Sequence, residues 1–291
     1  MRLLLLSIAA CALAAAVPRG AGAGAWPQPP GASYIKIAGG YLYSEHEYDS
    51  QGEKVDILAG DPLITDTSYR DVSFTAYLEY GVGERLTLVG SLPFKILTST
   101  RTETTAFADL TRAVDVTNGG LSDLRLGLRY PLQTAPFPVS VQGNVKIPLR
   151  YDARPDNAGP PLGSGALDLD LNLLAGASLW PLPGYVGASV GYRLRGGTLA
   201  DEIVFTVEAG SGWERFAARV TLDGTYSTVR PEPLTESATT TLTNEDVLKL
   251  LPAIEFGLGA GTALVAEAYH VLAGRNTVAG TTWALGLVLR R

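Results

Sequence analysis

The chain of 291 residues has almost no cysteine and almost no histidine. Its single cysteine is Cys11, so the rest of the chain can form neither an internal disulfide nor a thiolate site for zinc or iron–sulfur. Histidine, the usual general base of hydrolytic enzymes, occurs only at His46 and His270. The sequence contains no His-Glu-x-x-His motif and no phosphate-binding loop. We therefore expect no enzymatic activity, no metal site and no cofactor.

Long apolar runs and basic tracts are also missing. After residue 25 no uninterrupted apolar stretch approaches the 18 residues that a membrane-spanning helix needs, which argues against a helical membrane protein. The chain has 23 basic and 29 acidic residues and a formal charge of −6. Because nucleic-acid binding relies on concentrated positive charge, we expect no nucleic-acid partner.

The first 25 residues resemble a secretory signal peptide. Arg2 precedes an apolar run over residues 3–17, and residues 23–25 form a small-x-small cleavage site. Cleavage there would leave a mature chain of residues 26–291 that starts at Trp26 and contains no cysteine. The alternatives are an uncleaved anchor and a lipid attached to Cys11.

The mature chain alternates polar and apolar side chains. Residues 121–130 place Asp123, Arg125 and Arg129 on one face and leucines and a tyrosine on the other. This period of two is typical of a β-strand with one polar face. It returns in many later segments, for example residues 139–147, 166–173 and 215–223, and about twelve such segments can be counted.

Short and long connections alternate between these segments. Brief turns such as residues 81–83 and 259–261 are followed mostly by longer polar stretches. Outer-membrane barrels are built in this way. We therefore predict an all-β fold, a single transmembrane antiparallel β-barrel of about 12 strands. The competing fold is a soluble β-sandwich, but the apolar side chains exceed what a sandwich of this length usually buries.

Aromatic residues lie near the ends of several predicted strands. On a barrel they would form the belts that mark the two membrane interfaces. This set comprises Tyr41, Tyr43, Tyr80, Tyr130, Trp180, Tyr185 and Trp283.

Charged residues share the opposite face of the strands, which would line the lumen of a barrel. Ionised groups there need water or partners of opposite charge, because burying one unpaired costs several kcal/mol. They can form a lattice of ion pairs that braces the barrel, a hydrated path with a transverse field, or both. Near balance of the two signs predicts weak ion selectivity. The candidate solute path comprises Glu79, Arg85, Asp123, Arg125, Arg129, Lys146, Asp168, Asp170, Arg193, Glu208, Arg219, Glu255 and Glu267, and the same face carries Lys36, Arg195, Glu202, Arg215 and Asp223.

Two segments are expected to be extracellular loops. Residues 98–119 and 230–245 are rich in threonine, serine, glutamate and proline. We interpret them as solvated connections rather than as pore constrictions.

Five motifs follow one another along the chain: residues 88–94 (LVGSLPF), 120–130 (GLSDLRLGLRY), 145–148 (VKIP), 162–168 (LGSGALD) and 190–193 (VGYR). In this order and spacing they resemble one family, the outer-membrane proteins of the phenol-degradation MetA pathway. The resemblance implies an outer-membrane channel that admits small hydrophobic or aromatic compounds. Two features differ from related transporters. Residues 26–33 are too short for an N-terminal hatch, and the chain ends in Arg290-Arg291 rather than in an aromatic residue.

Together these features predict a monomeric channel in the bacterial outer membrane. Its expected partners are outer-membrane lipid, a small-molecule solute and the barrel-assembly machinery. A non-conducting structural or surface-binding barrel remains the alternative. A lipid-modifying enzyme is a third possibility, and it would depend on His46 or His270.

Overall fold

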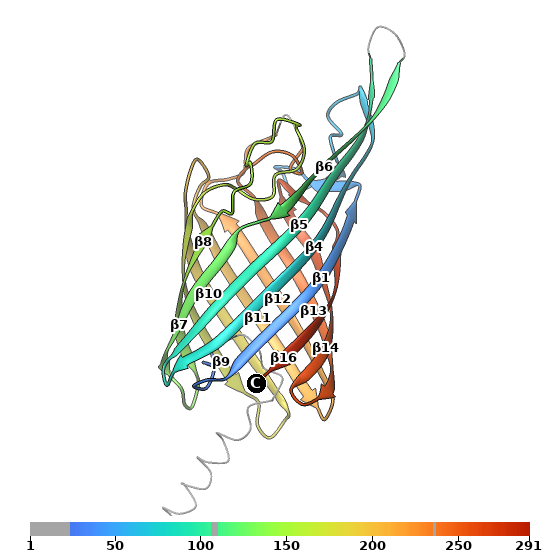
Figure 1. Cartoon of the computed structure of the whole chain (residues 1–291). Helices are drawn as coiled ribbons and strands as arrows, with labels where there is room; N and C mark the ends of the chain where they lie inside the picture. Colours follow the sequence, from blue (N-terminus) through green and yellow to red (C-terminus); the bar gives the residue numbers. More distant parts are fainter. Residues whose placement is uncertain (1–23, 106–109, 235–236) are drawn as a thin grey trace, which may run out of the picture.

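The computed structural model describes residues 24–105, 110–234 and 237–291, so all but the end of the predicted signal peptide lies outside it. The described chain is a closed antiparallel β-barrel (Figure 1). None of its described residues belongs to a helix long and apolar enough to cross a membrane. The strands are β1 (Ser33–Ser44), β2 (His46–Tyr48), β3 (Lys54–Asp56), β4 (Ile64–Gly83), β5 (Leu86–Thr104), β6 (Thr111–Leu121), β7 (Leu124–Gln133), β8 (Val139–Ile147), β9 (Asp168–Ser178), β10 (Gly184–Arg195), β11 (Glu202–Trp213), β12 (Phe216–Ser227), β13 (Asp246–Gly259), β14 (Thr262–Arg275), β15 (Thr277–Val278) and β16 (Thr281–Arg290).

The barrel closes because every wall strand has two neighbours. The order around the wall is β4-β1-β16-β14-β13-β12-β11-β10-β9-β8-β7-β5, and pairing between β4 and β5 completes the ring. β6 and β7 both pair with β5 and form one strand interrupted at Ser122 and Asp123. The wall therefore has 12 spanning strands, which confirms the predicted fold class. The short strands β15, β2 and β3 form a separate small sheet.

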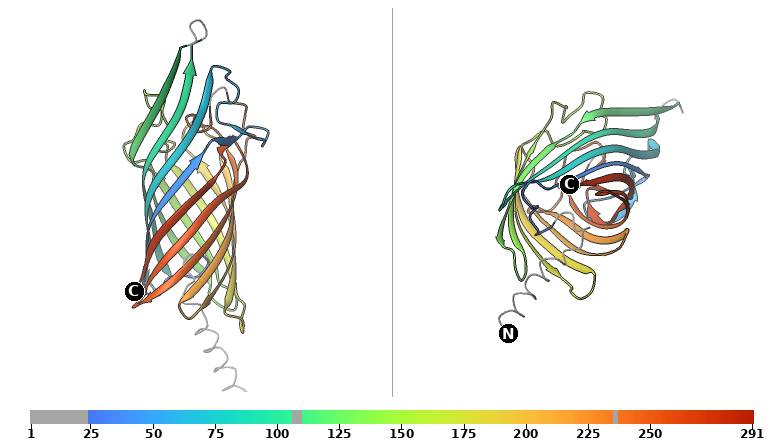
Figure 2. Two further views of the ribbon diagram at one scale, coloured as in Figure 1. Left: turned by 90° about the vertical axis from the view of Figure 1, so that its right-hand side faces the viewer. Right: turned by 60° about the horizontal axis from the view of Figure 1, so that its bottom comes forward.

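The two ends of the barrel differ in their connections. Turns of two to five residues join strands at one end, which we call the short-turn end. β1 begins and β16 ends at this end of the barrel (Figures 1 and 2). At the opposite, long-loop end, the connections include residues 45–63, 148–167 and 228–245. This is the alternation that the sequence predicts.

Side chains alternate between the two faces of the wall. On β9, Leu169, Leu171 and Leu173 are exposed on the outside, whereas Asp168 and Asp170 are buried inside. The same pattern holds around the ring, so large apolar side chains cover the outer surface. A barrel of this kind needs an apolar environment outside and tolerates charge inside.

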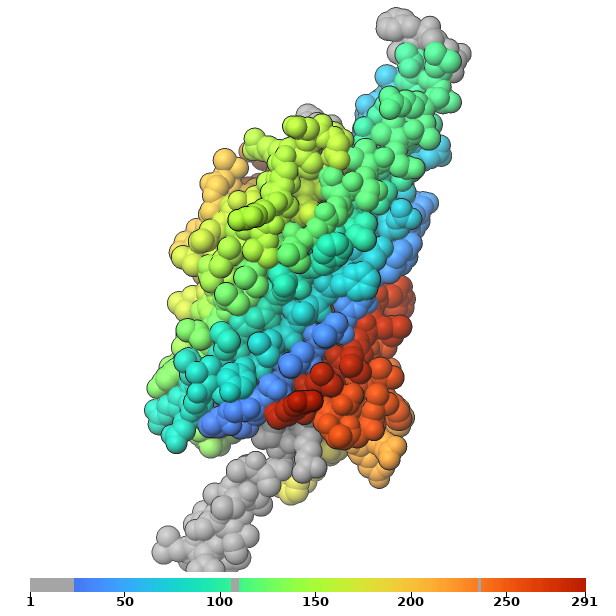
Figure 3. Space-filling view, in the orientation of Figure 1, coloured from blue at the N-terminus to red at the C-terminus, as the bar shows by residue number. Residues whose placement is uncertain are grey.

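One prediction about the loops is wrong. The segment 98–119 is mostly strand, because β5 continues to Thr104 and β6 begins at Thr111. With the start of β4, these strands form a sheet that projects beyond the long-loop end (Figures 1 and 3). Threonine or valine occupies alternate positions in much of these two segments, and such β-branched residues favour an extended backbone. The strands therefore form although neither face of the projecting sheet packs against a hydrophobic core. Residues 230–234 and 237–245, by contrast, contain no strand.

Candidate functional site

Near the long-loop end, a network of ion pairs runs along the luminal side of the wall from β7 to β11. Asp170 accepts hydrogen bonds from Arg193 Nε at 2.6 Å and from Arg125 Nη1 at 3.0 Å. Lys146 Nζ lies 2.6 Å from Asp168 Oδ2 and 3.5 Å from Asp123 Oδ2. Two further pairs continue the network around the wall, Arg193–Glu202 and Arg195–Glu202.

The ion pair between Arg129 and Glu79 lies nearer the short-turn end and is completely buried. Arg129 Nη2 donates to Glu79 Oε1 at 2.9 Å, and the two side chains are 2% and 0% exposed. Glu79 also accepts hydrogen bonds from Tyr77 at 2.5 Å and from Gln28 at 2.8 Å. A buried charge is tolerated when it is paired and its remaining hydrogen bonds are satisfied, and both conditions hold here.

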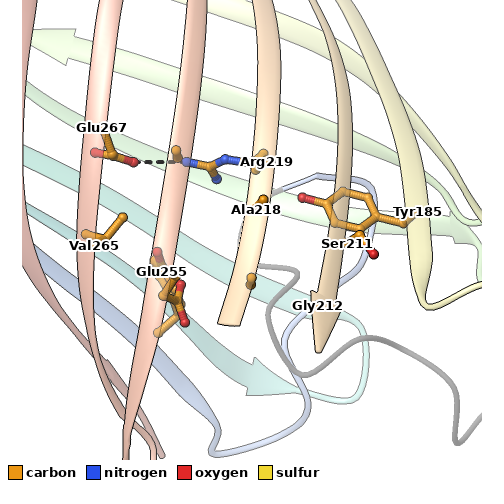
Figure 4. Close-up of a pocket in the computed structure, with 11 residues that line it drawn as sticks. Tyr185, Ser211, Gly212, Ala218, Arg219, Glu255, Val265 and Glu267 are labelled. Carbon is orange, nitrogen blue, oxygen red and sulfur yellow. Dashed lines mark hydrogen bonds and ion pairs between the residues drawn. The ribbon is translucent and has the colours of Figure 1, made fainter. Parts of the chain in front are cut away.

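A third cluster is centred on Arg219 and Glu267 (Figure 4). Arg219 Nη2 donates to Glu267 Oε1 at 3.0 Å, and Lys36 Nζ donates to Glu267 Oε2 at 2.9 Å. On its other side, Arg219 Nε lies 3.6 Å from Glu208 Oε2. Glu208 also accepts from the Tyr185 hydroxyl at 2.7 Å. The cluster encloses a cavity of about 30 Å³, enough for about two water molecules.

Register explains how these side chains reach one another. Ala253 on β13 pairs with Arg219 on β12 and with Glu267 on β14, so a small residue lies between the two charged ones. The guanidinium therefore passes over the alanine to reach the carboxylate two strands away. Glu79 on β4 and Arg129 on β7 likewise bridge over β5.

A larger cavity opens at the short-turn end. It has a volume of about 650 Å³ and is lined by β11 to β14, β16 and their turns. Glu255, Gly212 and Ala217 line both this cavity and the small one beside Arg219. The two hollows therefore meet at Glu255.

The other side of the short-turn end is occupied by the segment before β1, residues 24–32. Ser140 donates to the Ala25 carbonyl at 2.6 Å, and Arg129 donates to the Trp26 carbonyl at 3.2 Å. The Trp26 ring packs edge-on against Tyr185, with centroids 5.7 Å apart. A Cβ at Gly176 would lie 2.5 Å from the ring, so glycine makes room for it. The segment therefore enters the lumen.

Twelve of the thirteen predicted path residues, all except Arg85, form ion pairs. The prediction is wrong for Arg85, which is exposed at the turn between β4 and β5 and hydrogen-bonds Tyr130 on the outer face. A turn interrupts the alternation, so strand parity does not extend to position 85. Arg215 is displaced for the same reason and lies at the rim of the larger cavity.

Several aromatic side chains that point into the lumen were not predicted to do so from the sequence. Tyr185 belongs to the lumen rather than to an interfacial belt and is buried there. Its parity with Arg193 on the same strand is a signal that could have found it. Tyr34, Tyr77 and Tyr269 share the parity of charged neighbours and also point inward, and Tyr269 donates to Glu267 at 2.6 Å.

At the long-loop end, buried polar groups hold loops over the lumen. Glu47 accepts from Ser237 Oγ at 2.6 Å and from the Ala238 backbone N–H at 2.9 Å. Burial raises the pKa of the Glu47 carboxyl despite these hydrogen bonds. The Tyr151 hydroxyl donates to the Asp123 carboxylate, and burial together with this hydrogen bond raises the pKa of the Tyr151 hydroxyl.

The two histidines have different partners. His46 lies 3.3 Å from Asp56 in the small sheet, and His270 bonds Thr281 at 2.8 Å on the exposed side of β14. Residues 187–191 form a Gly-x-Ser-x-Gly motif around Ser189, but this motif lies within strand β10 and not at a turn. The Ser189 hydroxyl is hydrogen-bonded to the Thr206 hydroxyl at 2.8 Å. Among the described residues, no three His, Cys, Asp or Glu side chains are placed to hold a metal ion.

Comparisons with known proteins identify the fold. No family model matches the chain, and no curated protein matches its sequence. Among solved structures, the COG4313 outer membrane channel from Pseudomonas putida F1 is similar with a TM-score of 0.66 and 15% identity, over 91% of this chain and 97% of that one. The toluene transporter TbuX of Ralstonia pickettii aligns over 90% of each chain with a TM-score of 0.45 and 10% identity. The translocator domain of NalP from Neisseria meningitidis aligns over 98% and 96% with a TM-score of 0.47 and 12% identity. At such identities the first of these shows a shared barrel fold.

Proposed function

We propose that the protein is a passive outer-membrane channel for small solutes, with its path along the β11–β16 side of the lumen. The observation that carries this proposal is the hollow that runs from the short-turn end past Glu255 to the Arg219–Glu267 cluster. It lies inside a barrel whose outer surface is apolar, so water and polar solutes have one favourable route. The described ion pairs leave the luminal charge nearly balanced, which favours weak ion selectivity.

The orientation follows from the two ends. Outer-membrane barrels have short periplasmic turns and longer extracellular loops, so the short-turn end faces the periplasm. Residues 1–25 would then direct export and be removed, and the barrel-assembly machinery would insert a monomer surrounded by outer-membrane lipid.

The solutes we favour are small and aromatic. Tyr34, Tyr185 and Tyr269 border the Arg219–Glu267 cluster and offer ring faces beside charged groups. Aromatic faces attract other rings and organic cations. The resemblance to the phenol-degradation family points in the same direction, whereas the similarity to the COG4313 outer membrane channel supports a channel without indicating its solutes.

Substitution of Leu126 with arginine tests the membrane position. Leu126 lies on the outer face of β7 and is 39% exposed, and the proposed function places it within the membrane. We expect Leu126→Arg to lower the free energy of unfolding by about 2–4 kcal/mol in a bilayer. Leu132→Arg, on the same face but at the short-turn end, should cost only about 0–1 kcal/mol. Equal costs measured by urea titration in vesicles would count against a membrane around this face.

A braced barrel that does not conduct is the second candidate, because ion pairs and the N-terminal segment occupy much of the lumen. The two functions differ in ion flow across a planar bilayer. We expect the refolded chain to give discrete current steps. A folded but silent barrel would instead favour the structural function.

A further inference from the structure

The junction between the two luminal hollows is formed by one ion pair. Arg290 on β16 donates from Nη1 to Glu255 Oε1 at 2.6 Å and from Nη2 to Glu255 Oε2 at 2.7 Å. The pair reaches across β14 on the luminal side of the wall. Glu255 lines both hollows, whereas Arg290 lines the larger one at the short-turn end.

The pair differs from the enclosed Glu79–Arg129 pair in its access to water. The Arg290 and Glu255 side chains are 24% and 18% exposed, in contrast to the near-zero exposure of Glu79 and Arg129. The Arg290 guanidinium also lies over the ring of Tyr34, with its central carbon 5.3 Å from the ring centroid. The arginine thus keeps an aromatic support if the carboxylate is removed.

The backbone around Arg290 is fixed, so its charge stays at this place. The Arg290 N–H donates to the Gly261 carbonyl at 2.7 Å, and the Arg291 N–H donates to the Ser33 carbonyl at 3.0 Å. Glu255 is held between two neighbouring strands, opposite Ala217 on β12 and Val265 on β14. A solute that moves between the two hollows must pass these two side chains.

We propose that the Glu255–Arg290 pair sets the charge preference at the periplasmic exit of the lumen. This inference rests on the proposed channel function. In the intact pair the two charges offset each other, and the exit favours neither sign. Removal of one charge leaves the other facing the hollows, where it attracts solutes of opposite sign.

A single cysteine at position 217 provides the test, because the mature chain has none. Ala217 lies opposite Glu255 and lines both hollows. In refolded Ala217→Cys protein, the modification rates of an anionic and a cationic methanethiosulfonate of similar size are compared. We expect Glu255→Gln to raise the anionic-to-cationic rate ratio and Arg290→Gln to lower it, each by at least about fivefold. This is the effect expected of one unpaired unit charge about 4 Å from the charged reagent in water.

Two controls separate charge from structure. The double variant Glu255→Gln with Arg290→Gln should return the ratio close to its original value. Arg101→Gln removes an arginine from a comparable pair, Arg101–Glu103 at 2.7 Å, on the part of β5 that projects beyond the barrel, and should leave the ratio unchanged.

The outcomes distinguish this inference from the channel function. Opposite shifts in the two single variants support it, even if the unmodified barrel proves silent in a bilayer. Equal ratios in all variants would overturn it, as would shifts of the same sign. A conducting barrel with unchanged ratios would refute the exit pair and leave the channel function standing.

Discussion

Replacement of Arg129 with leucine is expected to lower the free energy of unfolding by about 3–5 kcal/mol, the cost of leaving a buried charge without its partner. Glu79 is fully buried and relies on Arg129 for its only salt bridge among the described residues. Gln28 and Tyr77 can donate hydrogen bonds to it but cannot neutralise its charge. Urea titration of the refolded protein in vesicles, followed by tryptophan fluorescence, measures the change.

The matched control for this prediction is Arg125→Leu. Arg125 is also a luminal arginine on β7, but its side chain is 39% exposed and its partner Asp170 retains Arg193 at 2.6 Å. Its loss should therefore cost much less. Adding Glu79→Gln to Arg129→Leu should restore most of the lost stability, because the unpaired charge is gone. A cost below about 1 kcal/mol for Arg129→Leu would show that water reaches Glu79.

Deletion of residues 26–30 is expected to raise the single-channel conductance several-fold. This segment contributes the Trp26 ring that packs against Tyr185, and its Gln28 backbone N–H donates to Thr87 at 2.9 Å. Without it, the lumen beside β7 to β10 opens at the short-turn end. The conductance of the deleted and the unmodified chains, recorded in planar bilayers at the same salt concentration, measures the effect.

A graded control accompanies the deletion. Trp26→Ala removes the ring but keeps the backbone carbonyl of residue 26, which accepts a hydrogen bond from Arg129. It should give an intermediate conductance. A heat-shifted gel band must first establish that each variant is folded. If the folded deletion variant conducted no better than the unmodified chain, the segment would not limit conduction through the lumen.

The wall of the barrel could be predicted from sequence because its alternation is physically strict. A strand that carries Asp168 and Asp170 on one side and leucines on the other has only one stable arrangement between lipid and water. The strand count and the sides of most charged residues follow from this parity. The prediction failed at Arg85, where a turn breaks the period, and at Tyr185, where an aromatic at a strand end was assigned to an interface without regard to parity.

The pairing of the luminal charges could not be predicted. Arg219 reaches Glu267 because Ala253 lies between them in register, and register in a barrel depends on the stagger of all its strands. The position of the N-terminal segment was equally inaccessible. Residues 26–30 read Trp-Pro-Gln-Pro-Pro and have no periodicity, and their place in the lumen results from contacts with residues about 50 to 160 positions away, such as Glu79 and Tyr185.

The Glu255–Arg290 pair illustrates both situations. Strand parity predicted that Glu255 is luminal, but Arg290, the last residue of β16, was not among the predicted luminal residues. β16 pairs with β14, and β14 pairs with β13, so the Arg290 guanidinium reaches the Glu255 carboxylate across one strand. Residues at strand ends of a barrel therefore merit the same parity test as those in strand centres.

The most direct test of the central claim, a continuous hydrated path through the barrel, is single-channel recording of the refolded chain of residues 26–291 in a planar lipid bilayer. We expect small discrete current steps whose size rises with salt concentration and whose reversal potential in a salt gradient stays close to zero, because the luminal charges are paired. A protein that shows a heat-shifted, folded band and inserts into the bilayer without any current steps would contradict the channel function.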